Sequence, residues 1–108
     1  MRAQSLKSAV RAAAGSNQKY LLRLYVTGAT SRSRRAILNI KAVCQQVLEG
    51  RYELEIIDIH QNPALAKDEQ ILATPTLVKR LPLPLRRLIG DFSDRERVLF
   101  GLDLKPEK

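Results

Sequence analysis

Apolar residues alternate with polar residues, or recur at helical spacing, along most of the chain, and this pattern predicts its elements. Residues 20–27 (YLLRLYVT) and 52–59 (YELEIIDI) are rich in β-branched and aromatic residues, which favours two strands. Between them, residues 34–48 carry apolar positions three and four apart, which predicts an amphipathic helix. Its apolar stripe consists of Ile37, Ile40, Cys44, Val47 and Leu48. A strand–helix–strand order of this kind predicts a parallel pair.

Shorter elements separated by prolines are predicted for the second half of the chain. They are, in order, a short helix that opens at Asn62-Pro63, a strand over 71–78, an extended connector over 81–84, a strand over 86–89 and a last helix that begins at a capping box over 93–96. The complete order is β-α-β-α-β-β-α. We therefore predict an α/β fold of the thioredoxin-like class.

Residues 72–77 (LATPTL) are the most informative stretch, because an apolar strand here contains Pro75. Proline cannot donate to a ladder and is confined to strand starts, edges or bulges. The Thr-Pro-Thr interruption is similar to the cis-proline strand of thioredoxin-like domains, where a Cys-x-x-Cys pair lies nearby. This chain has one cysteine, Cys44, on an apolar helix stripe. We expect a buried thiol, which disfavours the alternative of a thiol-redox protein.

Length and composition indicate one domain. The chain has 108 residues, of which 44% are hydrophobic, and no apolar run approaches the ~20 residues that span a bilayer. We expect a cytoplasmic protein with no membrane partner. Residues 1–19 are basic and are expected to form a flexible extension, with a transit-like or membrane-surface helix as the alternative. The domain is predicted over 20–104, and 105–108 form a short tail.

The net charge of +8 requires that a nucleic-acid partner be considered. The basic residues gather in two clusters, Arg32, Arg34 and Arg35, and then Lys79, Arg80, Arg86 and Arg87. Aromatic residues make up only 5%, so a base-stacking platform is missing and nucleic acid is disfavoured. An acidic protein surface suits these cations better. His60 is the only histidine, so we expect no metal site, no cofactor and no enzyme activity.

Several motifs together resemble those of one family. They are residues 24–28 (LYVTG), 57–59 (IDI) with Asn62-Pro63, 72–77 (LATPTL) and 81–96 (LPLPLRRLIGDFSDRE). Over residues 20–104 the chain closely resembles the KaiB family of cyanobacterial circadian clock proteins. The resemblance implies a non-enzymatic protein that binds the ring-shaped ATPase KaiC, opposes KaiA, competes with SasA-like kinases and engages CikA-like kinases. It also implies a metamorphic protein. Its ground-state fold forms a homo-oligomer, a tetramer or alternatively a dimer, and its thioredoxin-like monomer binds KaiC.

The two ends of the sequence depart from the family pattern. The segment before Tyr20 is longer and more basic than is usual, and the acidic tail of clock members is missing. The alternative to a core clock component is therefore a divergent homologue that acts in stress adaptation or in a simpler timer.

The resemblance also assigns residues. It places Tyr20, Arg35, Lys79 and Arg87 at partner-binding positions, and Pro75, Gly101 and Asp103 at positions of the fold switch. The alternative for Tyr20 is that it only packs on the sheet. The alternative for Arg35, Lys79 and Arg87 is that each is an ordinary solvated basic residue. We expect a cis bond before Pro75 in the thioredoxin-like state.

The pattern at the C-terminal end itself fits two structures. Val98, Phe100, Leu102 and Leu104 alternate as on a strand, yet a helix-capping box precedes them. Within a helix, Gly101 costs ~1 kcal/mol relative to Ala, and Asp103 faces the negative end of the helix dipole. We therefore predict that Gly101→Ala combined with Asp103→Arg favours the thioredoxin-like monomer.

Overall fold

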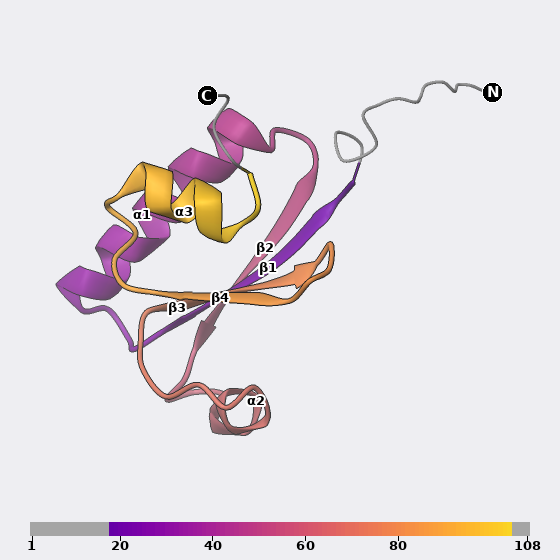
Figure 1. Cartoon of the computed structure of the whole chain (residues 1–108). Coiled ribbons are helices and arrows are strands. Elements are labelled where there is room, and N and C mark those ends of the chain that lie inside the picture. Colours follow the sequence, from indigo (N-terminus) through magenta and orange to yellow (C-terminus); the bar gives the residue numbers. More distant parts are fainter. Residues whose placement is uncertain (1–17, 105–108) are drawn as a thin grey trace, which may run out of the picture.

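A four-stranded mixed sheet with helices on both faces forms the described part of the chain, residues 18–104, in a computed structural model (Figure 1). The elements are β1 (Tyr20–Val26), α1 (Ser31–Val47), β2 (Tyr52–Asp58), α2 (Pro63–Asp68), β3 (Thr76–Leu81), β4 (Arg86–Ile89) and α3 (Arg95–Gly101). This is the predicted β-α-β-α-β-β-α order. The strand order is β2-β1-β3-β4, with β1 and β2 parallel and the other pairs antiparallel.

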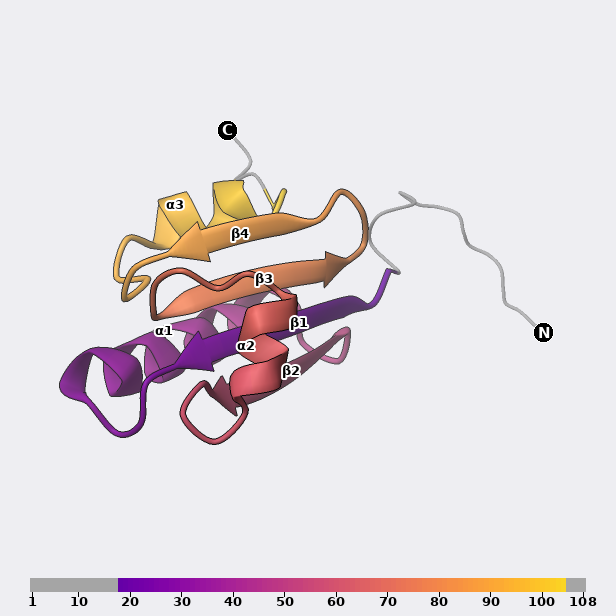
Figure 2. The same ribbon diagram turned by 90° about the horizontal axis from the view of Figure 1, so that it is seen from below.

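The two faces of the sheet carry different helices. Helices α1 and α3 lie on one face and α2 lies on the other (Figures 1 and 2). The main core lies under α1 and α3, and its fully buried side chains include Leu24, Ile40, Cys44, Leu77 and Leu102. A smaller cluster under α2 contains Tyr25, Ile57 and Val78, with Leu65 and Ile71 packed against it. Burial of such side chains stabilises the fold by roughly 1.5–3 kcal/mol each.

The predicted helix over 34–48 is present but begins earlier, at Ser31. Thr30 is its N-cap, and the Thr30 hydroxyl accepts a hydrogen bond from the Ser33 N–H at 3.1 Å. The apolar stripe predicted for this helix faces the core as expected. The capping residue of α3 also differs by one position, because Asp94 rather than Ser93 caps it and accepts from the Arg97 N–H. Side-chain capping therefore sets both helix starts.

The strand predicted over 71–78 is wrong in its first half, because β3 covers Thr76–Leu81. The Ile71 N–H instead bonds to the Ala66 carbonyl, and the Thr76 hydroxyl donates to the Ala73 carbonyl. These local bonds, with the missing N–H of Pro75, keep residues 71–75 out of the ladder. The Thr74–Pro75 bond is cis, as predicted, and the bonds before Pro82 and Pro84 are also cis.

The predicted extension and tail mostly lie outside the described residues, since the description covers 18–104. Within these residues, no helix combines the length and the apolar character needed to cross a membrane.

Candidate partner-binding surface

The second basic cluster of the sequence consists of two cation pairs on neighbouring strands. Lys79 and Arg80 lie on β3, Arg86 and Arg87 lie on β4, and Lys79 is directly opposite Arg86. Successive side chains of a strand point to opposite faces of the sheet. Each pair therefore supplies one cation to the α3 face and one to the α2 face, and the cluster is divided into two charge networks.

On the α3 face, Asp103 holds Lys79 and Arg86. The Lys79 ammonium bonds to the Asp103 carboxylate at 2.6 Å, and the Lys79 side chain is only 1% exposed. The Arg86 guanidinium reaches both oxygens of this carboxylate at 3.3 Å. The hydrogen bond from Lys79 is the largest cause that lowers the pKa of Asp103, and the hydrogen bond from Arg86 lowers it further. We call these three residues the Asp103 network.

The backbone of Asp103 completes the end of α3. Its φ is +63°, and its N–H bonds to the Phe100 carbonyl at 3.0 Å. The Leu104 N–H bonds to the Leu99 carbonyl at 2.7 Å. This pair of bonds is the Schellman motif, in which glycine is the usual left-handed residue. The carboxylate beyond the helix end faces two cations, which offsets its unfavourable position relative to the helix dipole.

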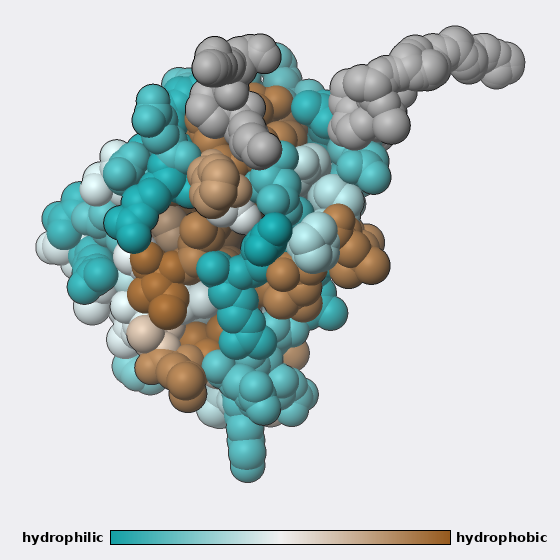
Figure 3. Space-filling model, viewed as in Figure 1, coloured by the Kyte–Doolittle hydropathy of each residue, from teal (hydrophilic) through white to brown (hydrophobic). Residues whose placement is uncertain are grey.

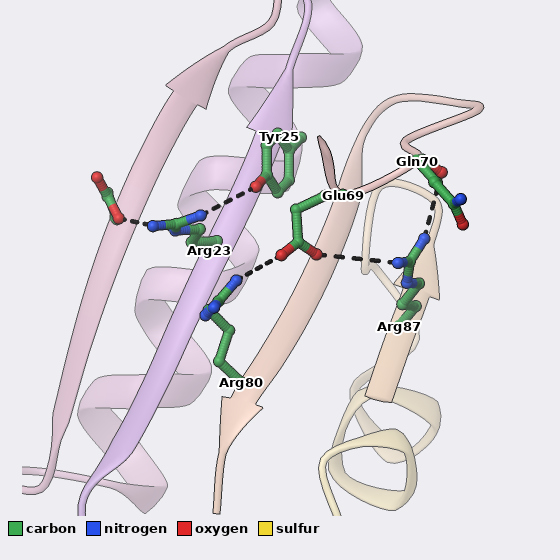
Figure 4. A network of polar contacts seen from close by, with 7 residues as sticks. Arg23, Tyr25, Glu69, Gln70, Arg80 and Arg87 are labelled. Atoms are coloured by element: carbon green, nitrogen blue, oxygen red, sulfur yellow. Dashed lines mark hydrogen bonds and ion pairs between the residues drawn. The ribbon is translucent and has the colours of Figure 1, made fainter. Parts of the chain in front are cut away.

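On the α2 face, Glu69 holds Arg80 and Arg87 (Figure 4). Glu69 is the C-cap of α2, and its two oxygens pair with Arg80 and, at 3.8 Å, with Arg87. Arg87 also donates to the Gln70 carbonyl at 3.2 Å. We call Glu69, Arg80 and Arg87 the Glu69 network. It connects the C-terminal end of α2 to β3 and β4.

Next to this network lies the most exposed large hydrophobic side chain among the described residues. Leu72 is 95% exposed, and with Ala66, Lys67, Gln70 and Ile71 it lines a hollow of about 470 Å³. We call these five residues the α2 surface. Gln70, whose carbonyl receives Arg87, has a φ of +57°. The Glu69 network therefore fixes the backbone that presents Leu72.

The four residues predicted to bind partners lie in different environments. Arg87 belongs to the Glu69 network and borders the α2 surface, whereas Arg35 lies on α1, where it pairs with Asp91 at 3.4 Å. Lys79 is buried in the Asp103 network. Tyr20 is also buried, and burial raises the pKa of its hydroxyl. In this fold, only Arg35 and Arg87 of the four present their charge to solvent.

Gly101, predicted to act in the fold switch, is the last residue of α3 and packs against β4. A Cβ atom at this position would lie 2.1 Å from the Leu88 Cδ2 atom. Helix propensity alone, which favours alanine here, does not include this contact with Leu88. The roles of Pro75, Gly101 and Asp103 in a fold switch stay predictions.

The loop that would hold a redox pair in a thioredoxin carries hydroxyl groups instead. Thr27 and Thr74 share a hydrogen bond between their hydroxyl oxygens, beside the cis Thr74–Pro75 bond. Cys44 is fully buried, and burial raises the pKa of its thiol to about 11. A thiol of this kind is protonated at neutral pH and is a poor nucleophile. Among residues 18–104, no group of histidine, cysteine and acidic side chains could hold a metal ion.

Sequence reasoning missed Glu69 and Leu72. Glu69 was not singled out because its partners lie 11 and 18 positions further along the chain, and only the fold brings them together. The sequence pattern predicts Leu72 as part of an apolar strand over 71–78. The signal that could have found it was Pro75, because a strand that starts after the proline leaves Leu72 outside the sheet.

Comparison with solved structures confirms the thioredoxin-like fold. The N-terminal domain of SasA from Synechococcus elongatus superposes with a TM-score of 0.66 and 23% sequence identity, over 98% of each chain. Mitochondrial thioredoxin 3 from Saccharomyces cerevisiae superposes with a TM-score of 0.65 and 16% identity, over 82% of this chain and 80% of the other.

Comparison of sequences identifies a family, whereas the comparison of structures shows only the fold. The KaiB domain model matches residues 23–104. The circadian clock protein KaiB3 of a Synechocystis species is 52% identical over 89 residues, covering 82% of this chain and 87% of that protein. The circadian clock oscillator protein KaiB of Synechococcus elongatus is 55% identical over 85 residues, covering 79% and 83%. The chain therefore belongs to the KaiB family.

Proposed function

We propose that this chain is a non-enzymatic clock component that binds a KaiC-type ring ATPase and modulates its phosphorylation cycle. In this role it opposes a KaiA-type activator, competes with a SasA-type kinase and engages a CikA-type kinase. Identity of 52–55% to clock proteins of the family supports the proposal. The chain shares its fold with the SasA domain, and competition between the two for one site on the ring ATPase requires such a similarity in shape.

The observation that carries the proposal is the α2 surface. A leucine that is 95% exposed beside a hollow is unfavourable in water and is suited to burial by a partner. Arg87 adds a cation at its border, and the Glu69 network holds both in place. Arginine is among the residues enriched at binding hot spots, and an exposed apolar side chain beside it gains free energy when a partner buries it. We assign this surface to the ring ATPase.

A pull-down with a purified KaiC-type ATPase tests the assignment. Leu72→Asp is expected to lower binding by at least about tenfold, since it removes an apolar anchor and adds a charge. Leu38→Asp is the matched control, because Leu38 is 67% exposed on α1 and should bind as the wild type does. Equal binding by the wild type and Leu72→Asp would contradict the assignment.

The role of Arg87 is tested by charge reversal. Arg87→Glu should weaken capture of the ring at moderate salt, and unaltered binding would show that the assignment of this contact is wrong. Because Arg87 also holds Glu69, Glu69→Gln serves as the comparison. A loss with Arg87→Glu that clearly exceeds the loss with Glu69→Gln indicates direct contact. Equal losses indicate that Arg87 acts only by positioning α2.

We also propose that the chain has the tetrameric ground-state fold of the family, in equilibrium with the thioredoxin-like monomer. From helix propensity and the helix dipole, Gly101→Ala with Asp103→Arg is expected to shift this equilibrium toward the monomer. The contacts of Gly101 with Leu88 and of Asp103 with the buried Lys79 oppose that shift, so the variant measures which of the two effects is larger. Size-exclusion chromatography with NMR measures the shift, and an unchanged tetramer fraction would contradict the expectation. A pull-down from the native host would distinguish a core clock component from a homologue in stress adaptation or a simple timer, by identifying the ATPases and kinases captured.

A further inference from the structure

The connection between β3 and β4 exposes leucines at its tip. Leu81 is 43% exposed, Leu83 is 74% exposed and Leu85 is 47% exposed. We call these three residues the leucine tip. Figure 3 shows hydrophobic surface where this hairpin projects from the body of the molecule in Figure 1. Scattered exposed leucines are ordinary, but three within five residues at a projecting end form a patch that is suited to an apolar environment.

Basic residues surround the leucine tip. Arg80 precedes Leu81 on β3 and Arg86 follows Leu85 on β4. Leu21 at the start of β1 is paired with Leu81, which brings Lys19 to the same end of the sheet. The carboxylates that pair with Lys19, Arg80 and Arg86 are those of Glu53, Glu69 and Asp103. Arg51 joins this end as well, since its carbonyl accepts from the Tyr20 N–H at 2.8 Å.

The sequence is also basic before β1. Residues 1–19 contain Arg2, Lys7, Arg11 and Lys19 and no acidic residue. Of these four, Lys19 lies among the described residues, directly before β1, whose Leu21 pairs with Leu81.

We propose that the leucine tip inserts into the headgroup region of a bilayer that contains anionic lipids. Such a bilayer offers an apolar acyl boundary and a layer of anionic phosphates. The leucine side chains enter the acyl boundary, and the lysine and arginine side chains around them face the lipid phosphates. A nucleic-acid backbone would use the cations but would leave the leucines exposed. Insertion of a loop tip needs no spanning helix. The proposal revises the sequence-based expectation of no membrane partner, which rested on the missing apolar run.

This inference is independent of the proposed clock function, because the leucine tip and the α2 surface share no residue. A leucine-tip variant should therefore still capture the ring ATPase. A failure of membrane binding would leave the α2 assignment untouched, and the reverse also holds.

Co-sedimentation of the full chain with lipid vesicles tests the proposal. The wild type should bind phosphatidylcholine vesicles that contain phosphatidylglycerol, should not bind pure phosphatidylcholine, and should dissociate as salt is raised. Leu83→Asp should weaken binding by roughly tenfold, the loss expected for one buried leucine. Leu38→Asp is again the matched control, since it changes a similarly exposed leucine on α1 and should leave vesicle binding unchanged.

Three results would overturn the proposal. The first is no binding of the wild type to the phosphatidylglycerol vesicles. The second is equal binding by Leu83→Asp and the wild type, because the leucines would then have no part in it. The third is a wild type that does not bind vesicles but self-associates in size-exclusion chromatography, together with a Leu83→Asp variant that no longer self-associates. This would show that the tip is an interface between copies of the chain. Circular dichroism of each variant confirms that it is folded.

Discussion

The two faces of the sheet use the same charge arrangement in different surroundings. On the α3 face, Asp103 lies between Lys79 and Arg86, and Lys79 is 1% exposed. On the α2 face, Glu69 lies between Arg80 and Arg87, which are both 40% exposed. The Glu69 side chain is itself only 14% exposed, so the two networks differ in their cations. Removing the carboxylate is costly where the cation left behind is buried, as Lys79 is, and costs less where the cations are exposed to water, as Arg80 and Arg87 are. The Asp103 network should therefore matter for stability far more than the Glu69 network does.

Each network anchors the C-terminal end of a helix that is too short to be stable alone. Helix α2 has 6 residues and α3 has 7, and isolated helices below roughly 12 residues are marginal in water. Glu69 caps α2, and Asp103 follows the end of α3. The comparison indicates that α3 is held firmly by a buried cation, while α2 is held by contacts that solvent can replace.

The largest expected effect is that of Asp103→Asn. It leaves the buried Lys79 ammonium without its carboxylate and should lower the free energy of unfolding by about 2 kcal/mol. This is below the ~3–5 kcal/mol of a fully buried pair because the Asp103 side chain is 37% exposed. Urea denaturation at low protein concentration, where mass action favours the monomer, measures the loss.

The control for Asp103→Asn is the same change in a Lys79→Met background. Removing the buried cation should make the asparagine substitution much less costly, because no unpaired charge remains. Equal losses in the two backgrounds would show that Asp103 acts through its backbone conformation alone.

Acid should weaken the Asp103 network selectively. The pKa of Asp103 is lowered by its bonds to Lys79 and Arg86, so the network stabilises the fold above the ordinary carboxyl range near pH 4. This contribution is lost as the pH falls through the lowered pKa. Wild-type stability should therefore fall more steeply below about pH 4 than that of Asp103→Asn, by no more than the cost of that variant at neutral pH. Parallel acid profiles for the two proteins would contradict the role of the carboxylate.

Gly101→Ala tests the packing of α3 on β4 without touching either network. The new Cβ would lie 2.1 Å from Leu88 Cδ2, and displacing this side chain should destabilise the fold by about 1 kcal/mol. In a Leu88→Ala background the same change should be neutral or stabilising, since alanine has the better helix propensity. Urea denaturation of the four proteins measures the coupling, and additive effects would exclude the contact.

The smallest effect is expected for Glu69→Gln. Arg80 and Arg87 can bind water in place of the lost carboxylate, so the free energy of unfolding should fall by only about 0.5 kcal/mol. Amide hydrogen exchange of α2 should rise locally, because the helix loses its connection to β3 and β4. A global loss as large as that of Asp103→Asn would remove the contrast between the two faces.

The positions of the cations show how far sequence reasoning extends. The sequence shows Lys79, Arg80, Arg86 and Arg87 as one basic cluster, the family resemblance places Lys79 at a partner-binding position, and the predicted strand ends at residue 78. Once β3 is known to cover 76–81, the pleat alone places Lys79 and Arg80 on opposite faces. The predicted strand is three residues too short at its C-terminal end, and this error concealed both networks.

Local sequence is enough to predict the order of elements, the α/β fold, the apolar stripe of α1 and the burial of Cys44. Local periodicity and turn residues carry these features, since they depend on neighbours a few positions apart. Long-range packing instead buries Lys79 against Asp103, joins Glu69 to Arg80 and Arg87, and places Gly101 against Leu88. These contacts join residues 11–24 positions apart. Pairing over such separations depends on strand register and helix docking, which the global packing sets.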